Sequence, residues 1–168
     1  MIIILNGPLG IGKSTLAETL MERLELCAMI EGDSLVAVNP PAADELEHLH
    51  SAIELLVIHH RRFGYRHFVV DHLWRSAADL ADLRRRLTPI DAEGEIRCFL
   101  LTLPADVNLR RIERRQDARA IDERDFELRT CEEEREMLAK YSGLGEPFDV
   151  SAAPPELAAR MLQLLAIG

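Results

Sequence analysis

The stretch Gly7-Pro-Leu-Gly-Ile-Gly-Lys13-Ser14 decides how this 168-residue chain folds and what it binds. It fits the pattern G-x-x-x-x-G-K-[ST] at every fixed position. Glycines at this spacing let the backbone turn so that several N–H groups point at one phosphate, beside a helix N-terminus. The apolar run IIIL precedes the stretch and the helical pattern STLAETLMERL follows it, which is the context that the pattern requires. The segment therefore predicts a phosphate-binding loop, or P-loop, with a nucleoside triphosphate as its ligand.

The side chains of this segment have expected roles at the phosphates. The Lys13 ammonium reaches the outer phosphates as a catalytic cation, and the Ser14 hydroxyl sits on Mg²⁺. We therefore expect ATP and Mg²⁺ as cofactors. The predicted nucleotide-binding residues are Gly7, Pro8, Leu9, Gly10, Ile11, Gly12, Lys13, Ser14 and Thr15.

The rest of the chain alternates short apolar runs with longer amphipathic segments, which is typical of an α/β protein with a parallel sheet. No repeat or Ser/Gly linker interrupts it, so we expect residues 1–168 to form a single domain of the P-loop class. The expected architecture has three layers around a five-stranded parallel sheet in the order 2-3-1-4-5. The strand candidates are Ile2–Leu5, Cys27–Ile30, His67–Val70, Ile96–Leu103 and Phe148–Val150.

Helical periodicity and capping signals predict the helices between these strands. Ser76 precedes AADLADLRRRL as a capping residue, and Pro154 and Pro155 suit the first turn of the last helix. The polar stretch QDARAIDERD separates two of the predicted helices. The expected helices are Ser14–Leu24, Glu45–Phe63, the segment after Ser76, Asp106–Arg115, Phe126–Ala139 and the segment from Pro154 to Ala166.

Composition excludes several other classes of protein. With 20 basic and 29 acidic residues, the charge of −9 argues against a general nucleic-acid binder, which needs a basic surface. Three widely spaced cysteines (Cys27, Cys98 and Cys131) are typical of buried thiols in a reducing compartment. No apolar run approaches the roughly 18 residues of a membrane span, and the MIIILNG start lacks the basic region of a signal peptide. We expect a cytoplasmic protein that binds neither nucleic acid nor membrane.

Within the P-loop class, the chain resembles the small-molecule and nucleotide kinases along nearly its whole length. The guanine-reading pattern N-K-x-D is absent, and there is no room for the helical domain of larger ATPase motors. In these kinases the second strand ends near the acceptor with an acidic residue, the third ends in Asp, and an arginine-bearing lid follows the fourth. The matching segments are Glu31-Gly-Asp33-Ser-Leu35, Phe68-Val-Val-Asp71 and Arg110–Arg124. The opening MIIILNG and the segment GDSLV look most like chloramphenicol phosphotransferase and related resistance kinases. The wider pattern is similar to gluconate, shikimate and adenylate kinases.

Asp33 is the candidate general base and contacts the acceptor. A carboxylate at the C-terminal edge of a strand beside the P-loop strand is well placed to align a hydroxyl and take its proton. In the phosphotransferases that this chain resembles, the Asp of the segment has that role. The alternative is an Asp that caps the next helix, and Glu31 is the second candidate for the base.

Asp71 and Arg75 are the candidates at the end of the third strand. An Asp at this place usually holds Mg²⁺ through water, so Ser14 and Asp71 form the expected metal site. The stretch Asp71-His-Leu-Trp-Arg75-Ser76 aligns with D-G-F-P-R-T of adenylate kinases, in which the Arg contacts the acceptor nucleotide, but the Gly and Pro are missing here. Arg75 is therefore a candidate substrate-binding residue, with a solvated arginine as the alternative. His72 is a further candidate for the wall of the acceptor pocket.

The predicted lid covers about residues 110–125 and brings arginines to the transferring phosphoryl group. Arg111 and Arg115 share a helix face, and Arg110 and Arg114 form an alternative pair of the same spacing. Related kinases carry an arginine pair in the register of the first, so Arg111 and Arg115 are the catalytic candidates. The alternative is an exposed helix whose arginines pair with Glu113 and Asp117. By its position, the stretch Val150-Ser-Ala-Ala-Pro-Pro155 corresponds to the loop that touches adenine in related kinases.

The resemblance implies an enzyme that uses ATP and Mg²⁺ to transfer the γ-phosphoryl group to a hydroxyl of a small molecule. An antibiotic or a related metabolite is the first acceptor class; a sugar acid, a shikimate-like acid or a nucleotide comes next. One alternative is a nucleoside or nucleotide monophosphate kinase, favoured if Arg75 and the group Arg61-Arg62-Arg66 bind an acceptor phosphate. Another is a regulatory protein that binds nucleotide with little catalysis, in which Glu45–Phe63 is a surface for a partner. The sequence predicts neither the acceptor's identity nor the oligomeric state.

Overall fold

A computed structural model describes residues 1–90, 95–115 and 121–166, and gives only the backbone of residues 115 and 121–124. The described part contains a five-stranded parallel sheet in the order β2-β3-β1-β4-β5. This confirms the α/β class and the predicted strand order. The strands are β1 (Ile2–Asn6), β2 (Cys27–Glu31), β3 (His67–His72), β4 (Ile96–Thr102) and β5 (Glu146–Asp149).

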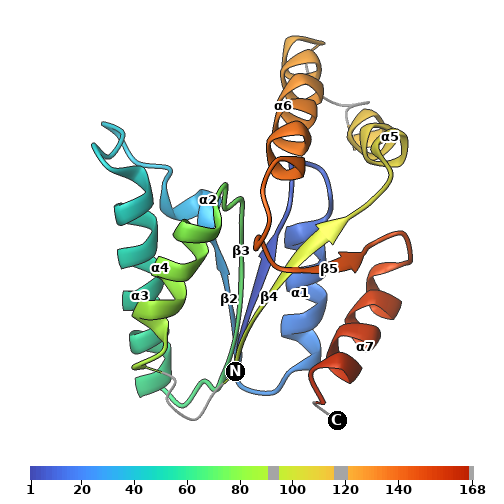
Figure 1. Cartoon of the computed structure of the whole chain (residues 1–168). Helices are drawn as coiled ribbons and strands as arrows, with labels where there is room; N and C mark the ends of the chain where they lie inside the picture. Colours follow the sequence, from blue (N-terminus) through green and yellow to red (C-terminus); the bar gives the residue numbers. More distant parts are fainter. Residues whose placement is uncertain (91–94, 116–120, 167–168) are drawn as a thin grey trace.

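Helices cover both faces of the sheet, which gives the expected three layers (Figure 1). The helices α1 (Lys13–Arg23) and α7 (Pro154–Leu164) pack on one face, and α3 (Glu45–Arg62) and α4 (Ala77–Leu87) pack on the other. Two further helices, α5 (Ala105–Arg115) and α6 (Ile121–Ala139), lie beyond the C-terminal ends of the strands. None of the helices in the described ranges is long and apolar enough to span a membrane.

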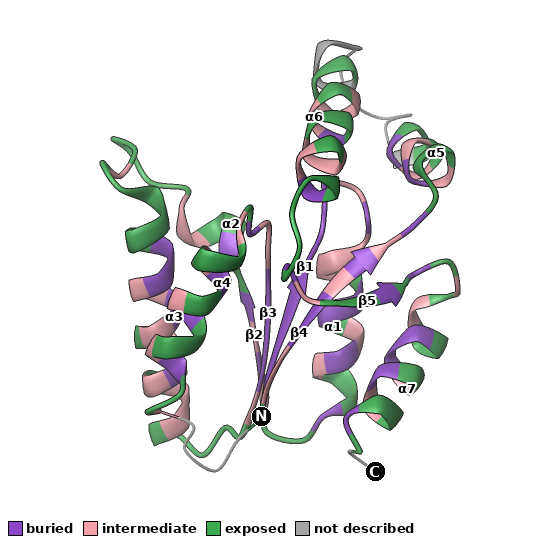
Figure 2. Cartoon of the chain, viewed as in Figure 1, coloured by how far each residue is buried: buried purple, intermediate pink, exposed green. Residues whose placement is uncertain are grey.

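The central strand β1 is buried on both faces, as its run of β-branched residues predicts. Ile3 and Leu5 belong to the core under α1 and α7, whereas Ile2 and Ile4 belong to the core under α3 and α4. Side chains alternate between the two faces of a strand, so one short segment anchors both layers. Figure 2 shows the buried strands between helices whose outer sides are exposed. The loop that follows β1 therefore starts from a fully buried strand.

The structure confirms the predicted cap of α4 and corrects three other expectations. Ser76 and Asp79 form a reciprocal capping box, in which each side chain accepts a hydrogen bond from the other residue's backbone N–H. The helix α6 begins at Ile121 and not at Phe126, so half of the stretch expected to be a polar separator is helical. The strand β5 begins at Glu146 and contains Pro147, which an edge strand tolerates because one side of its backbone has no strand partner. A one-turn helix that was not predicted, α2 (Gly32–Leu35), follows β2 directly.

The register of the sheet brings three strand ends together beside the P-loop. Asn6 is paired with His72, and Glu31 is paired with Asp71. The Asn6 side chain is fully buried and donates to the carbonyl oxygens of Trp74 and Leu144, at 3.1 Å each. Its Oδ1 accepts a hydrogen bond from the Trp74 N–H at 3.0 Å. Asn6 thus fastens the loop after β3 and the loop before β5 to the strand that leads into the P-loop.

Candidate active site

The P-loop connects β1 to α1, and its shape depends on glycine at position 10. Gly10 has φ +73°, and a Cβ at this position would lie 2.4 Å from Cγ1 of Ile112 on α5. Any other residue would be strained there and would also displace α5. Lys13 begins α1, and its Nζ donates to the carbonyl oxygens of Gly7 at 2.8 Å and Pro8 at 3.2 Å. Burial lowers the pKa of Lys13, while the nearby carboxylates of Asp33, Glu134 and Asp71 act to raise it.

Ser14 and Asp71 meet as the prediction of a metal site requires. The Ser14 hydroxyl donates to Oδ2 of Asp71 at 2.8 Å, and Asp71 is only 2% exposed. Burial raises the pKa of Asp71, against the effect of the hydrogen bond from Ser14. The other carboxylate oxygen, Oδ1, is buried without a hydrogen-bond partner among the residues that the structure describes. A hydroxyl next to a carboxylate with a free oxygen fits Mg²⁺, which prefers oxygen ligands and retains several waters.

Asp33 lies at the start of α2 and is held by His72 from the end of β3. The Nδ1 atom of His72 lies 2.7 Å from Oδ1 of Asp33. The hydrogen bond to His72 is the main cause that lowers the pKa of Asp33, with the charges of His72 and Lys13 acting in the same direction. Gly32 permits this pairing, because a Cβ there would lie 2.7 Å from the Cβ of His72.

The alternative role for Asp33, as a helix cap, is wrong. The N-cap of α2 is Glu31, and no side chain makes the capping hydrogen bond. Glu31, the second candidate for the base, instead accepts a hydrogen bond from the Ser34 hydroxyl. Asp33 exposes 70% of its side chain, whereas its partner His72 exposes 15%, so His72 is the fixed member of the pair.

A cleft of about 500 Å³ joins the P-loop to these acceptor-side candidates. Lys13, Asp33 and Arg75 all line this cleft, and so does His72, as predicted for the wall of the acceptor pocket. Leucines from α3 and from the loop after β3 make its apolar part. The lining residues are Leu9, Lys13, Asp33, Val36, Glu45, Leu46, Leu49, His72, Leu73, Arg75, Asp79 and Glu134.

A second cavity, of about 480 Å³, lies on the other side of the P-loop. The loop after β5, which contains the segment from Val150, forms part of its wall, and contact of this segment with adenine stays a prediction. Arg111 also lines this cavity. Its Nη1 donates to the Ile11 carbonyl at 3.2 Å and its Nη2 to the Val150 carbonyl at 2.8 Å. The lining residues are Gly10, Ile11, Gly12, Thr15, Leu16, Arg111, Arg114, Val150, Ser151, Ala152, Ala153, Pro154 and Leu157.

The predicted lid is only partly described. Arg110 pairs with Asp106 on the outside of α5, as the alternative of an exposed, salt-bridged helix expects for this residue. The side chain of Arg115 and residues 116–120 lie outside the described residues, so the predicted pairing of Arg111 with Arg115 stays a prediction.

Two residues at the P-loop were missed by sequence reasoning. The Leu9 N–H donates to Oε2 of Glu134 at 2.6 Å, and the Leu9 carbonyl accepts from Nδ2 of Asn108 at 3.2 Å. Glu134 comes from α6 and Asn108 from α5. No local motif marks either residue; the one available signal was that Asn108 is a polar residue on the buried side of an amphipathic helix.

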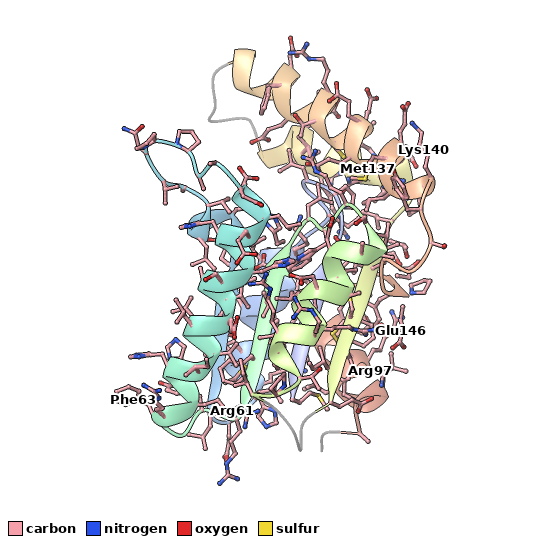
Figure 3. All side chains as sticks on the ribbon, turned by 60° about the vertical axis from the view of Figure 1, so that its left-hand side comes forward. Arg61, Phe63, Arg97, Met137, Lys140 and Glu146 are labelled. Atoms are coloured by element: carbon pink, nitrogen blue, oxygen red, sulfur yellow. The ribbon has the colours of Figure 1, made fainter. Side chains whose placement is uncertain are left out.

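The three arginines proposed for an acceptor phosphate do not lie at the cleft. Arg61 packs over the ring of Phe68 near the start of β3, and the Arg66 carbonyl accepts a hydrogen bond from the N-terminal amine. Figure 3 shows Arg61 at one end of the molecule and Met137 of α6 toward the other. Of the proposed group, only Arg75 lines the cleft.

Comparisons with known proteins agree with this architecture. A family model described as an AAA domain, AAA_33, matches residues 2–142. The tunicamycin resistance protein of Deinococcus radiodurans is similar in structure, with a TM-score of 0.69 at 20% identity, covering 99% of this chain and 96% of that one. A gluconokinase from Sinorhizobium meliloti 1021 gives a TM-score of 0.66 at 19% identity, over 98% of this chain and 94% of that one.

A shikimate kinase from Bacteroides thetaiotaomicron gives a TM-score of 0.61 at 15% identity, over 99% of this chain and 98% of that one. At these identities the likeness establishes the fold. No curated protein matched the chain in a sequence search.

Proposed function

The chain belongs to the AAA_33 family of AAA domains, and from this premise we propose that it is a kinase that transfers the γ-phosphoryl group of ATP to a hydroxyl group of a small molecule. One observation carries the proposal: Lys13 of the P-loop and the carboxylate Asp33 line the same cleft. A site for the phosphoryl donor and a group that can take the acceptor's proton therefore open into one space. Phosphoryl transfer requires this alignment more than it requires covalent help from the protein.

On the nucleotide side, backbone N–H groups of the P-loop bind the phosphates, and Lys13 neutralises the charge that develops during transfer. Ser14 and Asp71 would hold Mg²⁺, which when bound neutralises charge on the phosphates. The second cavity, which the loop after β5 and Arg111 line, is the proposed site for the base of the nucleotide. This assigns the donor to one side of the P-loop and the acceptor to the other.

On the acceptor side, Asp33 aligns the hydroxyl and accepts its proton as the bond to phosphorus forms. The hydrogen bond from His72 lowers the pKa of Asp33, so the carboxylate is ionised and its main contribution is to align the acceptor hydroxyl, at some cost in basicity. His72 holds one carboxylate oxygen by its hydrogen bond and leaves the other for the substrate. His72 is thus a positioning residue for the base.

Arg111 and Arg115 are proposed to stabilise the transferring group, as arginines do in related reactions. The hydrogen bonds from Arg111 to Ile11 and Val150 fix it between the P-loop and the base cavity. Arg111 therefore contributes first by shaping the nucleotide site. Its guanidinium has five N–H donors, so it can keep both bonds and still donate to the transferring group.

The acceptor we propose is an antibiotic or a related hydroxylated metabolite with an apolar part. Val36, Leu46, Leu49 and Leu73 give the cleft an apolar wall beside its carboxylates. The structural similarity to a tunicamycin resistance protein agrees with this class. Sugar acids and shikimate-like acids come second, since Arg75 is the one described cation of the cleft besides Lys13.

Arg75 also favours one alternative, a nucleoside or nucleotide monophosphate as acceptor. An arginine in the cleft can bind a phosphate, but without support from Arg61, Arg62 and Arg66 this site is weaker than the alternative assumed. A regulatory binder is less well supported, because the N-terminal part of α3 serves as a wall of the cleft through Glu45, Leu46 and Leu49.

We infer a cytoplasmic location from the dependence on ATP and from the free thiols Cys27, Cys98 and Cys131.

The test is an acceptor screen with purified protein, Mg²⁺ and ATP that records ADP release above the rate without acceptor. The panel contains hydroxylated antibiotics, sugars, sugar acids, shikimate-like acids, nucleosides and nucleoside monophosphates. We expect acceptor-dependent ADP release with at least one hydroxylated compound that has an apolar part. Tight ATP binding with no acceptor-dependent release across the panel would favour the regulatory binder.

A further inference from the structure

A carboxylate from a distant part of the chain lies on the P-loop itself. Oε2 of Glu134 accepts a hydrogen bond from the Leu9 N–H at 2.6 Å, across 125 positions of sequence. The short distance is typical of a hydrogen bond to a charged acceptor. The carbonyl of the same residue accepts a hydrogen bond from Nδ2 of the fully buried Asn108, and this Nδ2 also lies 2.8 Å from Sγ of Cys131. The helices α5 and α6 thus grip Leu9 from both sides.

The position of Leu9 shows which part of a nucleotide would meet Glu134. Leu9, Lys13 and Glu134 line the acceptor cleft, whereas Gly10, Ile11 and Gly12 line the cavity assigned to the base. If the proposed function holds, the phosphoryl group nearest the acceptor hydroxyl is the terminal one of a triphosphate. The Leu9 N–H is therefore at the end of the loop that receives this group, and Glu134 occupies that end.

One N–H group cannot serve two anions at full strength. A terminal phosphoryl oxygen on Leu9 would compete with the Glu134 carboxylate for the donor, and the two like charges would repel one another. A diphosphate lacks the terminal group and leaves the bond between Leu9 and Glu134 in place. Glu134 is also one of the carboxylates whose charge acts on Lys13, so its departure changes the balance of charge at the outer phosphates.

We propose that Glu134 is a specificity-determining residue that distinguishes triphosphate from diphosphate by holding the Leu9 N–H until a terminal phosphoryl group displaces it. This inference rests on the proposed function, because it takes the acceptor side of the P-loop as the place of the terminal phosphoryl group. Glu134 also lines the acceptor cleft, so its displacement reshapes that cleft when triphosphate binds. The acceptor cleft then takes its working shape only with the donor in place.

The test compares the binding of ADP and of a non-hydrolysable ATP analogue, both with Mg²⁺, by calorimetry and without any acceptor. Glu134→Gln removes the charge and keeps the size, and Glu134→Ala removes the hydrogen-bond acceptor as well. Glu133→Gln is the matched control, since Glu133 is the exposed neighbour on the same helix. We expect the affinity for the triphosphate to rise about tenfold in both Glu134 variants, within the usual range of coupling between sites. ADP affinity stays unchanged, and the control changes neither.

Unchanged ADP affinity also shows that the Glu134 variants are folded. An equal gain for ADP and the analogue would overturn the inference, because it would reduce Glu134 to a general repulsive charge. No gain, or weaker triphosphate binding, would overturn it too. The proposed function fails in a different way. If the Glu134 variants show the expected change in triphosphate affinity but the wild-type protein phosphorylates no compound of the screen, the kinase assignment is lost and the role of Glu134 in triphosphate recognition stands.

Discussion

The two sides of the P-loop are built by different means. On the nucleotide side, backbone groups do most of the work: the loop's N–H groups, its left-handed glycines and the carbonyls of Ile11 and Val150 that fix Arg111. On the acceptor side, side chains from α2, α3, β3 and α6 meet in one cleft, with Asp33 and His72 as the chemical pair. A backbone loop that binds phosphate needs glycines at fixed spacing, so it is recognisable as a motif in the sequence. A cleft lined by side chains can be assembled from many different sequences. The nucleotide side can therefore be predicted from a motif, whereas on the acceptor side only single residues such as Asp33, His72 and Arg75 were predicted and the rest of the cleft depends on the structure.

The largest expected effect separates the two sides through Asp33. Asp33→Asn keeps the shape and removes the proton acceptor, so acceptor phosphorylation should fall on the order of a hundredfold to ten-thousandfold. ATP binding, measured by calorimetry, should be almost unchanged because the carboxylate faces the acceptor. Glu31→Gln is the control. If Asp33→Asn transfers phosphate at the wild-type rate and Glu31→Gln does not, the base is Glu31.

A somewhat smaller effect is expected on the nucleotide side from Lys13→Ala. The loss of one preorganised cation at the outer phosphates should lower kcat by roughly a hundredfold to a thousandfold. Nucleotide affinity should fall less than kcat, because the backbone cradle remains. Lys140→Ala removes the only other lysine of the sequence, directly after the C-terminal end of α6 (Figure 3), and should leave both quantities unchanged. Wild-type turnover in Lys13→Ala would contradict the assignment of the P-loop.

The next prediction tests whether His72 positions Asp33 on the acceptor side. His72→Ala removes the hydrogen bond that positions Asp33, and kcat should fall about tenfold to a hundredfold, as for a misplaced catalytic group. His72→Asn keeps a donor N–H near the place of Nδ1 and should restore most of the lost kcat. The KM for ATP should be similar in both variants. Equal losses in the two would show that His72 supports the fold of the cleft and not the position of Asp33.

The smallest expected effect concerns Arg111. Arg111→Ala removes two hydrogen bonds to backbone carbonyls, and a net contribution of about 0.5 kcal/mol each corresponds to about fivefold in rate or affinity for the pair. If Arg111 also stabilises the negative charge that develops during transfer, kcat falls more than ADP affinity. Steady-state kinetics with ADP calorimetry separates the two. Equal losses would limit Arg111 to nucleotide binding, and no loss in either would remove it from the site.

Much of the fold follows from local patterns that the structure confirms. The buried run Ile2–Asn6, the cap at Ser76 and the parallel order of the strands all come from periodicity and capping physics. The predicted ends of strands and helices were wrong where contacts with the rest of the fold decide them. The strand β5 can include Pro147 because it lies at the sheet edge, and no local signal announces that position.

The site divides in the same way. Ser14 and Asp71 were predicted from their motifs, and the register of β1 and β3 brings them within hydrogen-bond distance. Glu134 and Asn108 were missed, because their contact with Leu9 depends on how α5 and α6 pack over the loop. Arg61, Arg62 and Arg66 were misplaced for a different reason: the prediction did not use their position before the third strand, which puts them at its N-terminal end, away from the P-loop. Strand direction, which the sequence pattern does imply, would have excluded them.

The central claim is that a phosphoryl group crosses from the nucleotide side of the P-loop to a hydroxyl in the acceptor cleft. The direct measurement is a single-turnover experiment in which the protein is loaded with Mg²⁺ and γ-labelled ATP, mixed with an acceptor from the screen and quenched at intervals. The account predicts that the label appears on the acceptor hydroxyl in step with the formation of ADP. Label that appears only as free phosphate, at the same rate with and without acceptor, would contradict it.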